Sequence, residues 1–112
     1  MNGCPRYTQI KFPPYRFIPG ENPHPTENPR GHSYGKKELD DTRLFVPEDW
    51  SKNEQCLFGI DLYNYGYWWE SHEAFEALWR ITPHGHVSRD YLQGLIKISG
   101  AFLLTFSYPK ME

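Results

Sequence analysis

Proline placement is the feature that most restricts how this chain can fold. Seven of the ten prolines fall within the first 30 residues: Pro5, Pro13, Pro14, Pro19, Pro23, Pro25 and Pro29. Proline lacks a backbone N–H and biases the preceding residue toward extended geometry. We therefore expect residues 1–47 to form an extended Pro-rich arm and residues 48–112 to form a helical domain, the two making one compact unit.

The predicted arm is too aromatic to be a plain linker. Its stretch "KFPPYRFIPG" carries Phe12, Tyr15 and Phe17, which suit a segment that lays its rings on the helical domain. A disordered tail is the alternative, because Pro-rich segments of low hydrophobicity often stay unfolded. The following stretch, "NPHPTENPRGHSYG", predicts a series of turns and contains His24 and His32.

Helical patterns begin near Pro47, which is followed by two acidic residues as at a helix N-terminus. The pattern over residues 53–80 is helical, although Gly59 and Gly66 weaken it. These glycines predict either a close approach of another segment or, at Gly66, a kink.

A second helical pattern follows a break at Pro83 and Gly85. It predicts a helix from about Arg89 to Phe106, capped by Ser88 and ended by Pro109. Its apolar residues cover most of the circumference, which predicts a central helix. The fold class expected from these patterns is all-α, a small helical bundle with the arm packed on it.

Composition excludes several classes of function. The chain has 112 residues, enough for one domain, and a formal net charge of −2 with no Lys/Arg stripe, so nucleic acid is not an expected partner. Cys4 and Cys56 form no CxxC pattern and predict neither a disulfide framework nor a thiolate zinc site. The longest nearly apolar run, residues 91–106, is short for a membrane helix, and no leader opens the chain. We expect a cytoplasmic protein with no membrane partner.

Residues 67–80, "YWWESHEAFEALWR", hold the strongest candidate site. On a helix of 100° per residue, His72 and Glu76 lie within about 40° of each other, on the same face as Tyr65, Trp68 and Trp79. These three aromatics are the predicted pocket wall. Glu73 lies at the edge of this face, and Glu70 on the other side.

A His/Glu cluster buried among aromatics must be paired or must bind something, and we expect it to hold a metal ion or a small polar ligand. His72 and Glu76 have the i,i+4 spacing that lets two ligands of one helix reach one divalent metal ion, and the set of one histidine and two carboxylates with Glu73 suits iron, manganese or zinc. His24 and His32 are predicted to complete the cluster if the arm crosses this helix. The alternative is a structural strut inside a non-catalytic or protein-interaction module. Enzymatic activity stays open, with metal-assisted hydrolysis and a glutamate general base as the simplest reaction.

The two helical motifs also resemble a known family. "DLYNYGYWWESHEAFEALWR" followed by "YLQGLIKISGAF" resembles the small all-helical bacterial and archaeal family called domain of unknown function 309. The hallmark of the family falls on Tyr63, Asn64, Gly66, Trp68 (in place of Tyr or Phe), His72, Glu73, Glu76 and Trp79, and its second motif on Gln93, Gly94, Leu95 and Ile96. The arm is similar to that of a longer subgroup with a PHP…GHSYG segment. The resemblance implies a helical bundle and no established reaction.

One departure from the family concerns the C-terminal helix. Family members usually continue with a further helix, whereas this sequence turns to "SYPKME". Apolar surface at Leu103, Leu104 and Phe106 then lacks its usual cover, which predicts self-association as a homo-oligomer through this helix.

Overall fold

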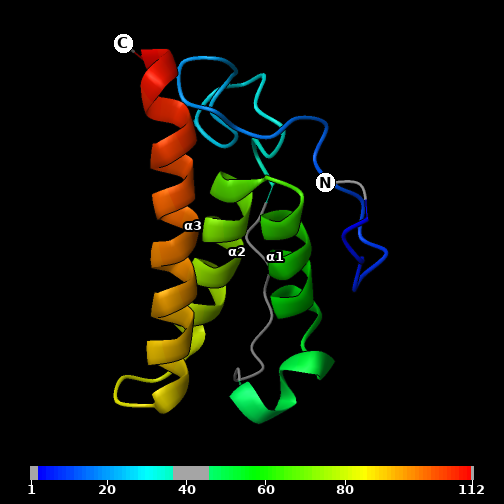
Figure 1. Cartoon of the computed structure of the whole chain (residues 1–112), viewed down its shortest axis with the longest axis vertical. Coiled ribbons are helices and arrows are strands. Elements are labelled where there is room, and N and C mark those ends of the chain that lie inside the picture. Colours follow the sequence, from blue (N-terminus) through cyan, green and yellow to red (C-terminus); the bar gives the residue numbers. More distant parts are fainter. Residues whose placement is uncertain (1–2, 37–45, 112) are drawn as a thin grey trace.

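The computed structural model describes residues 3–36 and 46–111 and has an all-α fold. A 3₁₀ helix, η1 (Pro47–Lys52), is followed by three α-helices: α1 (Glu54–Asn64), α2 (Trp68–Ile81) and α3 (Val87–Met111). The described residues contain no strand. Figure 1 shows the three helices running alongside one another, with the beginning of the N-terminal segment (residues 3–36) beside α1 and its later part at one end of the bundle. The predicted all-α fold is confirmed.

The helical pattern over residues 53–80 is divided into two helices at Gly66. The side chain of Asn53 starts α1 by accepting a hydrogen bond of 2.8 Å from the amide of Cys56. Gly66 has a φ of 84°, in the left-handed region that favours glycine, and this residue reverses the chain between α1 and α2. The sequence predicted a kink here, but the turn is sharp enough that Tyr65 does not share a helix with His72.

The start of α3 differs from the prediction because a histidine replaces the expected cap. The Nδ1 atom of His86 accepts a 3.1 Å hydrogen bond from the Ser88 amide, and α3 begins at Val87. Ser88 is buried and does not cap the helix. The helix also continues through Pro109 to Met111, so the prediction that Pro109 ends it is wrong, although a proline in a helix removes a backbone donor and crowds the preceding turn.

The core lies where the three helices meet and is centred on Cys56, Phe75, Leu78 and Leu92. Burial raises the pKa of the Cys56 thiol to about 11, so this group is protonated at neutral pH. Both cysteines are free.

Gly59 sets the distance between α1 and α2. A Cβ atom built on Gly59 would lie 2.7 Å from the Phe75 ring, closer than real carbon atoms approach. The hydroxyl of Ser71 donates a 2.9 Å hydrogen bond to the Gly59 carbonyl and lies 3.4 Å from the Ser99 hydroxyl of α3. The glycine therefore allows the close approach that the sequence suggested, and Ser71 connects all three helices.

Asp61 of α1 anchors the beginning of the N-terminal segment. Its fully buried carboxylate accepts hydrogen bonds from the amides of Tyr7 (2.8 Å) and Thr8 (3.0 Å) and from the Thr8 hydroxyl (2.7 Å). The Nε atom of Arg6 completes the site at 3.0 Å. Burial by itself would raise the pKa of Asp61, but these hydrogen bonds together hold the pKa below its ordinary value of 3.8.

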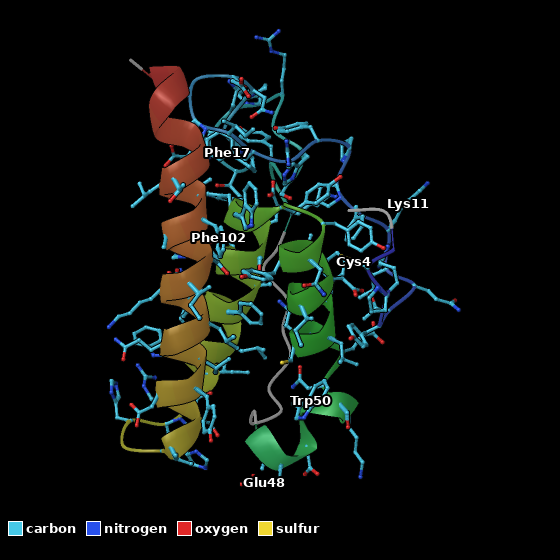
Figure 2. All side chains as sticks on the ribbon, in the orientation of Figure 1. Cys4, Lys11, Phe17, Glu48, Trp50 and Phe102 are labelled. Atoms are coloured by element: carbon cyan, nitrogen blue, oxygen red, sulfur yellow. The ribbon has the colours of Figure 1, made fainter. Side chains whose placement is uncertain are left out.

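Aromatic rings attach the rest of the N-terminal segment to the bundle. The Phe12 ring lies 4.9 Å from that of Tyr67 and 5.2 Å from that of Tyr65, measured between centroids. Phe17 meets the Trp69 ring edge to face at 5.6 Å. Figure 2 shows Phe17 at the end of the bundle opposite Glu48 and Trp50.

Several apolar side chains of α3 are exposed: Tyr91, Ile98, Phe102 and Leu104. The helix lies at one side of the bundle rather than at its centre (Figure 1). Leu104 is exposed as the sequence suggested, Leu103 is half-buried, and the side chain of Phe106 lies outside the described part. Within the described residues, no helix is long and apolar enough to cross a membrane.

We expect Gly59→Ala to destabilise the protein and Gly94→Ala to stabilise it. Gly94 lies in α3 with no heavy atom near a built Cβ, so alanine there adds about 1 kcal/mol of helix propensity. At Gly59 the same gain is outweighed by overpacking against the buried Phe75 ring, which costs about 1–3 kcal/mol. Urea unfolding of both variants measures the difference, and two variants of equal stability would contradict the close contact.

We expect Asp61→Asn to lower the free energy of unfolding at pH 7 by at least about 1.5–3 kcal/mol, the contribution of one charge-assisted hydrogen bond. The folded pKa of Asp61 lies below the ordinary value, so its stabilisation is present above pH 3.8 and is lost as the pH falls below it. Urea titrations between pH 7 and pH 2 should show the wild-type and variant stabilities converging in acid. A constant gap across this range would be inconsistent with the ionised Asp61 anchor.

Candidate functional site

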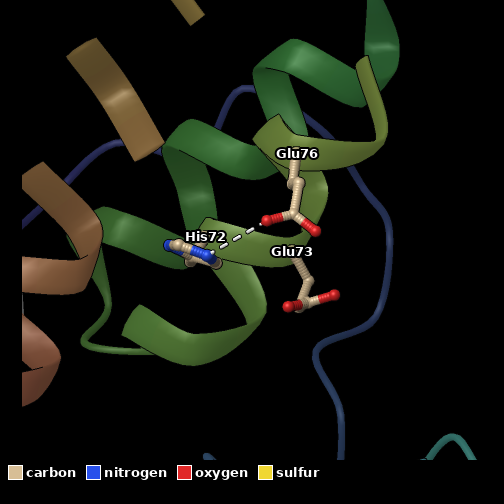
Figure 3. A group of neighbouring side chains, drawn as sticks. All are labelled: His72, Glu73 and Glu76. Carbon is tan, nitrogen blue, oxygen red and sulfur yellow. Dashed lines mark ion pairs between the residues drawn. The ribbon is translucent and has the colours of Figure 1, made fainter. Parts of the chain in front are cut away.

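His72, Glu73 and Glu76 come together on α2, as the sequence predicted for these three residues. One ligand atom of each lies within 4.8 Å of the others. Figure 3 shows the three side chains projecting from neighbouring turns of the helix, with the His72 ring directed toward the Glu76 carboxylate. Among the described residues, this is the group of histidine, cysteine or acidic side chains whose spacing suits a metal ion.

The orientation of His72 is fixed by α3. Its Nδ1 atom lies 3.2 Å from the carbonyl oxygen of Ile96. A Cβ atom built on Gly100 would lie 3.6 Å from the same nitrogen, so the ring also packs closely against this glycine. A carbonyl oxygen can only accept a hydrogen bond, so Nδ1 carries the proton. The Nε2 atom then faces the Glu76 Oε2 atom at 3.4 Å.

Glu76 lies between two basic side chains, Arg80 and His72. Its Oε1 atom is paired with the Arg80 guanidinium and its Oε2 atom faces His72. The side chains of His72 and Glu76 are 28% and 27% exposed. The predicted cluster was a buried one, and the structure instead places it at the surface of α2, where solvent reaches it.

The two arm histidines are placed elsewhere. His24 packs on the Phe17 and Trp69 rings, and its Nδ1 atom accepts a 3.1 Å hydrogen bond from the Glu27 amide, which closes a turn. His32 reaches α2 but pairs with Glu70 rather than with Glu76. Neither histidine belongs to the group formed by residues 72–76.

A buried pair of histidine and glutamate does exist, but it is formed by His32 and Glu70, a pairing that the sequence did not predict. The Nε2 atom of His32 lies 2.7 Å from Glu70 Oε2, and the two side chains are only 2% and 5% exposed. The same oxygen accepts a 2.9 Å hydrogen bond from the Phe17 amide. Glu70 was assigned to the far side of the helix from His72, and it is buried there because the N-terminal segment covers that side.

The predicted wall residues lie in three different places. The Tyr65 hydroxyl donates to the Cys4 carbonyl in the N-terminal segment. The Trp68 ring stacks on Phe102 of α3 at 6.0 Å. Trp79, in the last turn of α2, lies under the Arg89 guanidinium at 4.0 Å. They do not form one wall because the turn at Gly66 separates Tyr65 from α2, and Trp68 and Trp79 lie at opposite ends of that helix.

A comparison with protein families identifies the helical part of the chain. The model of the family described as Domain of unknown function (DUF309) matches residues 57–107. These residues are a DUF309 domain. The match includes His72, Glu73 and Glu76, so the candidate cluster lies inside the DUF309 domain. The segment that suggested the PHP…GHSYG subgroup lies outside the matched residues, and that subgroup stays a prediction. No curated protein and no solved structure matches the chain significantly.

We expect His32→Ala and His72→Ala to differ strongly in stability. Removing His32 leaves a buried carboxylate without its partner, which costs about 3–5 kcal/mol. Removing His72 breaks a half-exposed pair that contributes about 0–1 kcal/mol. Urea unfolding at pH 7 measures both variants. Equal losses would show that the burial of the His32–Glu70 pair has no energetic consequence.

Proposed function

We propose that this DUF309 domain binds a divalent metal ion through His72, Glu73 and Glu76. The observation that carries the proposal is the arrangement of His72 between Ile96 and Glu76. Because Nδ1 donates to the Ile96 carbonyl, a neutral His72 presents the lone pair of Nε2 to a carboxylate oxygen 3.4 Å away. Two acceptors that face each other at this distance require a cation or a proton between them.

The donor set suits zinc, manganese or iron. One imidazole nitrogen and two carboxylate oxygens are common ligands of these ions. Two ligands of one ion with bonds of about 2.0–2.2 Å are at most about 4.4 Å apart. The widest spacing in the cluster, 4.8 Å, therefore has to shorten slightly, which rotation of the half-buried glutamates allows.

The surroundings of the cluster resemble the outer shell of a metal site. Histidine ligands usually donate their second ring nitrogen to a fixed acceptor, as His72 does to the Ile96 carbonyl. The Arg80 guanidinium pairs with the Oε1 atom of Glu76, and the Oε2 atom of Glu76 remains directed toward His72. Three protein ligands on a solvent-accessible surface would leave room for water on the ion. Metal-assisted hydrolysis in the cytoplasm is therefore the activity that we propose to test first.

A second function is favoured by one contact. The Ile96 carbonyl joins His72 of α2 to α3, so a protonated His72 placed between Ile96 and Glu76 would be a structural strut of a non-catalytic module. Partial exposure favours the metal, since a strut that only fixes helix packing gains little from water access.

Isothermal titration of the chelator-treated protein with Zn²⁺, Mn²⁺ and anaerobic Fe²⁺ tests the proposal. We expect one ion per chain for at least one metal, weakened about 10–100-fold or more by His72→Ala and by Glu76→Gln. His84→Ala is the matched control, because His84 is an exposed histidine outside the cluster.

Two results would reject metal binding at this cluster. One is the absence of saturable binding by all three ions. The other is binding that His84→Ala reduces as much as His72→Ala does, which would mean non-specific coordination by surface histidines. Either result would favour the strut.

A further inference from the structure

A cavity of about 620 Å³ lies between the N-terminal segment and the helices α1 and α2. Its apolar lining comes from both sides: Phe12, Phe58, Leu62, Trp69 and Ala74. Sites for small organic molecules typically have this size and this mixture of aromatic walls with a few polar groups. The cavity is formed only because the N-terminal segment crosses the helices. It shares Glu73 with the cluster on α2, whereas His72 and Glu76 do not line it.

Glu70 gives this cavity an unused hydrogen-bond acceptor. The Oε2 atom of Glu70 is satisfied by His32 and by the Phe17 amide, whereas Oε1 has no hydrogen-bond partner. Among the described residues, Ser88 Oγ is the other buried side-chain oxygen that has no hydrogen-bond partner. Glu70 is 6% exposed and lines the cavity. A buried acceptor that lacks a donor costs about 1–3 kcal/mol, which a bound donor would recover.

The charged residues of the cavity lining differ in their burial. Glu70 is the most buried charged residue of the lining, whereas Lys11 and Lys36 are exposed. The lining thus combines a buried carboxylate oxygen, aromatic surface and exposed ammonium groups, together with the charged residues Glu73 and Arg80. A ligand that matches the buried acceptor and the exposed lysines has a hydrogen-bond donor and a negative charge.

We propose that this cavity binds a small aromatic molecule that carries an amino group at one end and an anionic group at the other. The amino group donates to Glu70, the ring packs against Trp69 and Phe12, and the anion lies near Lys11 and Lys36. Both nucleotides with an amino-substituted base and simple aromatic acids have this chemistry. The proposal does not depend on a metal at His72.

Two matched probe pairs test the proposal on the full chain. The first pair is adenosine monophosphate and the same nucleotide with an unsubstituted purine. The second pair is 4-aminobenzoate and benzoate. Isothermal titration gives the affinities, and the indole N–H signals of the protein in NMR spectra report contact with Trp69. We expect one amino-bearing probe to bind at least about tenfold more tightly than its partner, as the loss of a charge-assisted hydrogen bond predicts. The probe pair that shows the difference in affinity tells whether the ligand is a nucleotide or a simple aromatic acid.

Four variants locate the binding. Ala77→Phe fills the cavity from a half-buried position of α2 and should abolish binding while the chain stays folded. Glu70→Gln should remove the preference for the amino group, and Lys11→Ala with Lys36→Ala should weaken binding by about two- to fivefold each. His72→Ala is the control and should leave the affinity unchanged, which separates this site from the metal cluster.

The proposal is overturned if neither amino-bearing probe produces a saturable change in the wild-type protein. It is equally overturned if the probes with and without the amino group bind alike, or if Ala77→Phe binds as tightly as the wild type. The probe pairs act on the unmodified chain, so the test holds even where Glu70→Gln fails to fold.

Discussion

Two buried carboxylates on the helices hold the N-terminal segment in place. The described part of this segment has no helix or strand, and the backbone hydrogen bonds of its turns begin only at residue 18. Backbone donors before that point depend on other partners, including side chains of the helices. The Asp61 carboxylate accepts hydrogen bonds from the amides of Tyr7 and Thr8, and the Glu70 carboxylate accepts one from the amide of Phe17. Each carboxylate is compensated by a basic side chain from the segment itself, Arg6 or His32. The burial of these carboxylates is tolerable only because the segment supplies both backbone donors and a basic side chain to each of them.

This arrangement separates two kinds of polar site on α2. Glu70 points into the contact with the N-terminal segment, where the protein excludes solvent and a carboxylate oxygen is left without a partner. His72 and Glu76 lie at a half-exposed surface beside α3, where charges are partly solvated and a metal ion can enter. Glu73 lines the cavity and also belongs to the metal-like cluster, so the two sites are neighbours on one helix. A ligand in the cavity would therefore lie close to an ion held by the cluster.

The fold was largely predictable from local patterns. Helical periodicity and the prolines indicated an all-α chain, and the i,i+4 spacing brought His72 and Glu76 together without any tertiary information. The errors occurred where a single residue changes the backbone path. Gly66 turns the chain instead of bending it, which removed Tyr65 from the predicted wall, and His86 replaced Ser88 as the cap of α3. Such errors are expected because an assignment of faces at 100° per residue assumes one continuous helix.

By itself, the sequence determined the class of fold and the composition of the cluster on α2, because both follow from spacings within one helix. Only the tertiary structure decided which acids are buried. Asp61 and Glu70 resemble ordinary helix-surface acids in the sequence, and they become buried because a segment more than 50 residues earlier folds across them. The same crossing paired His32 with Glu70 and created the cavity beside it. Long-range contacts of this kind have no local signature, since they depend on where the chain returns rather than on its neighbouring residues.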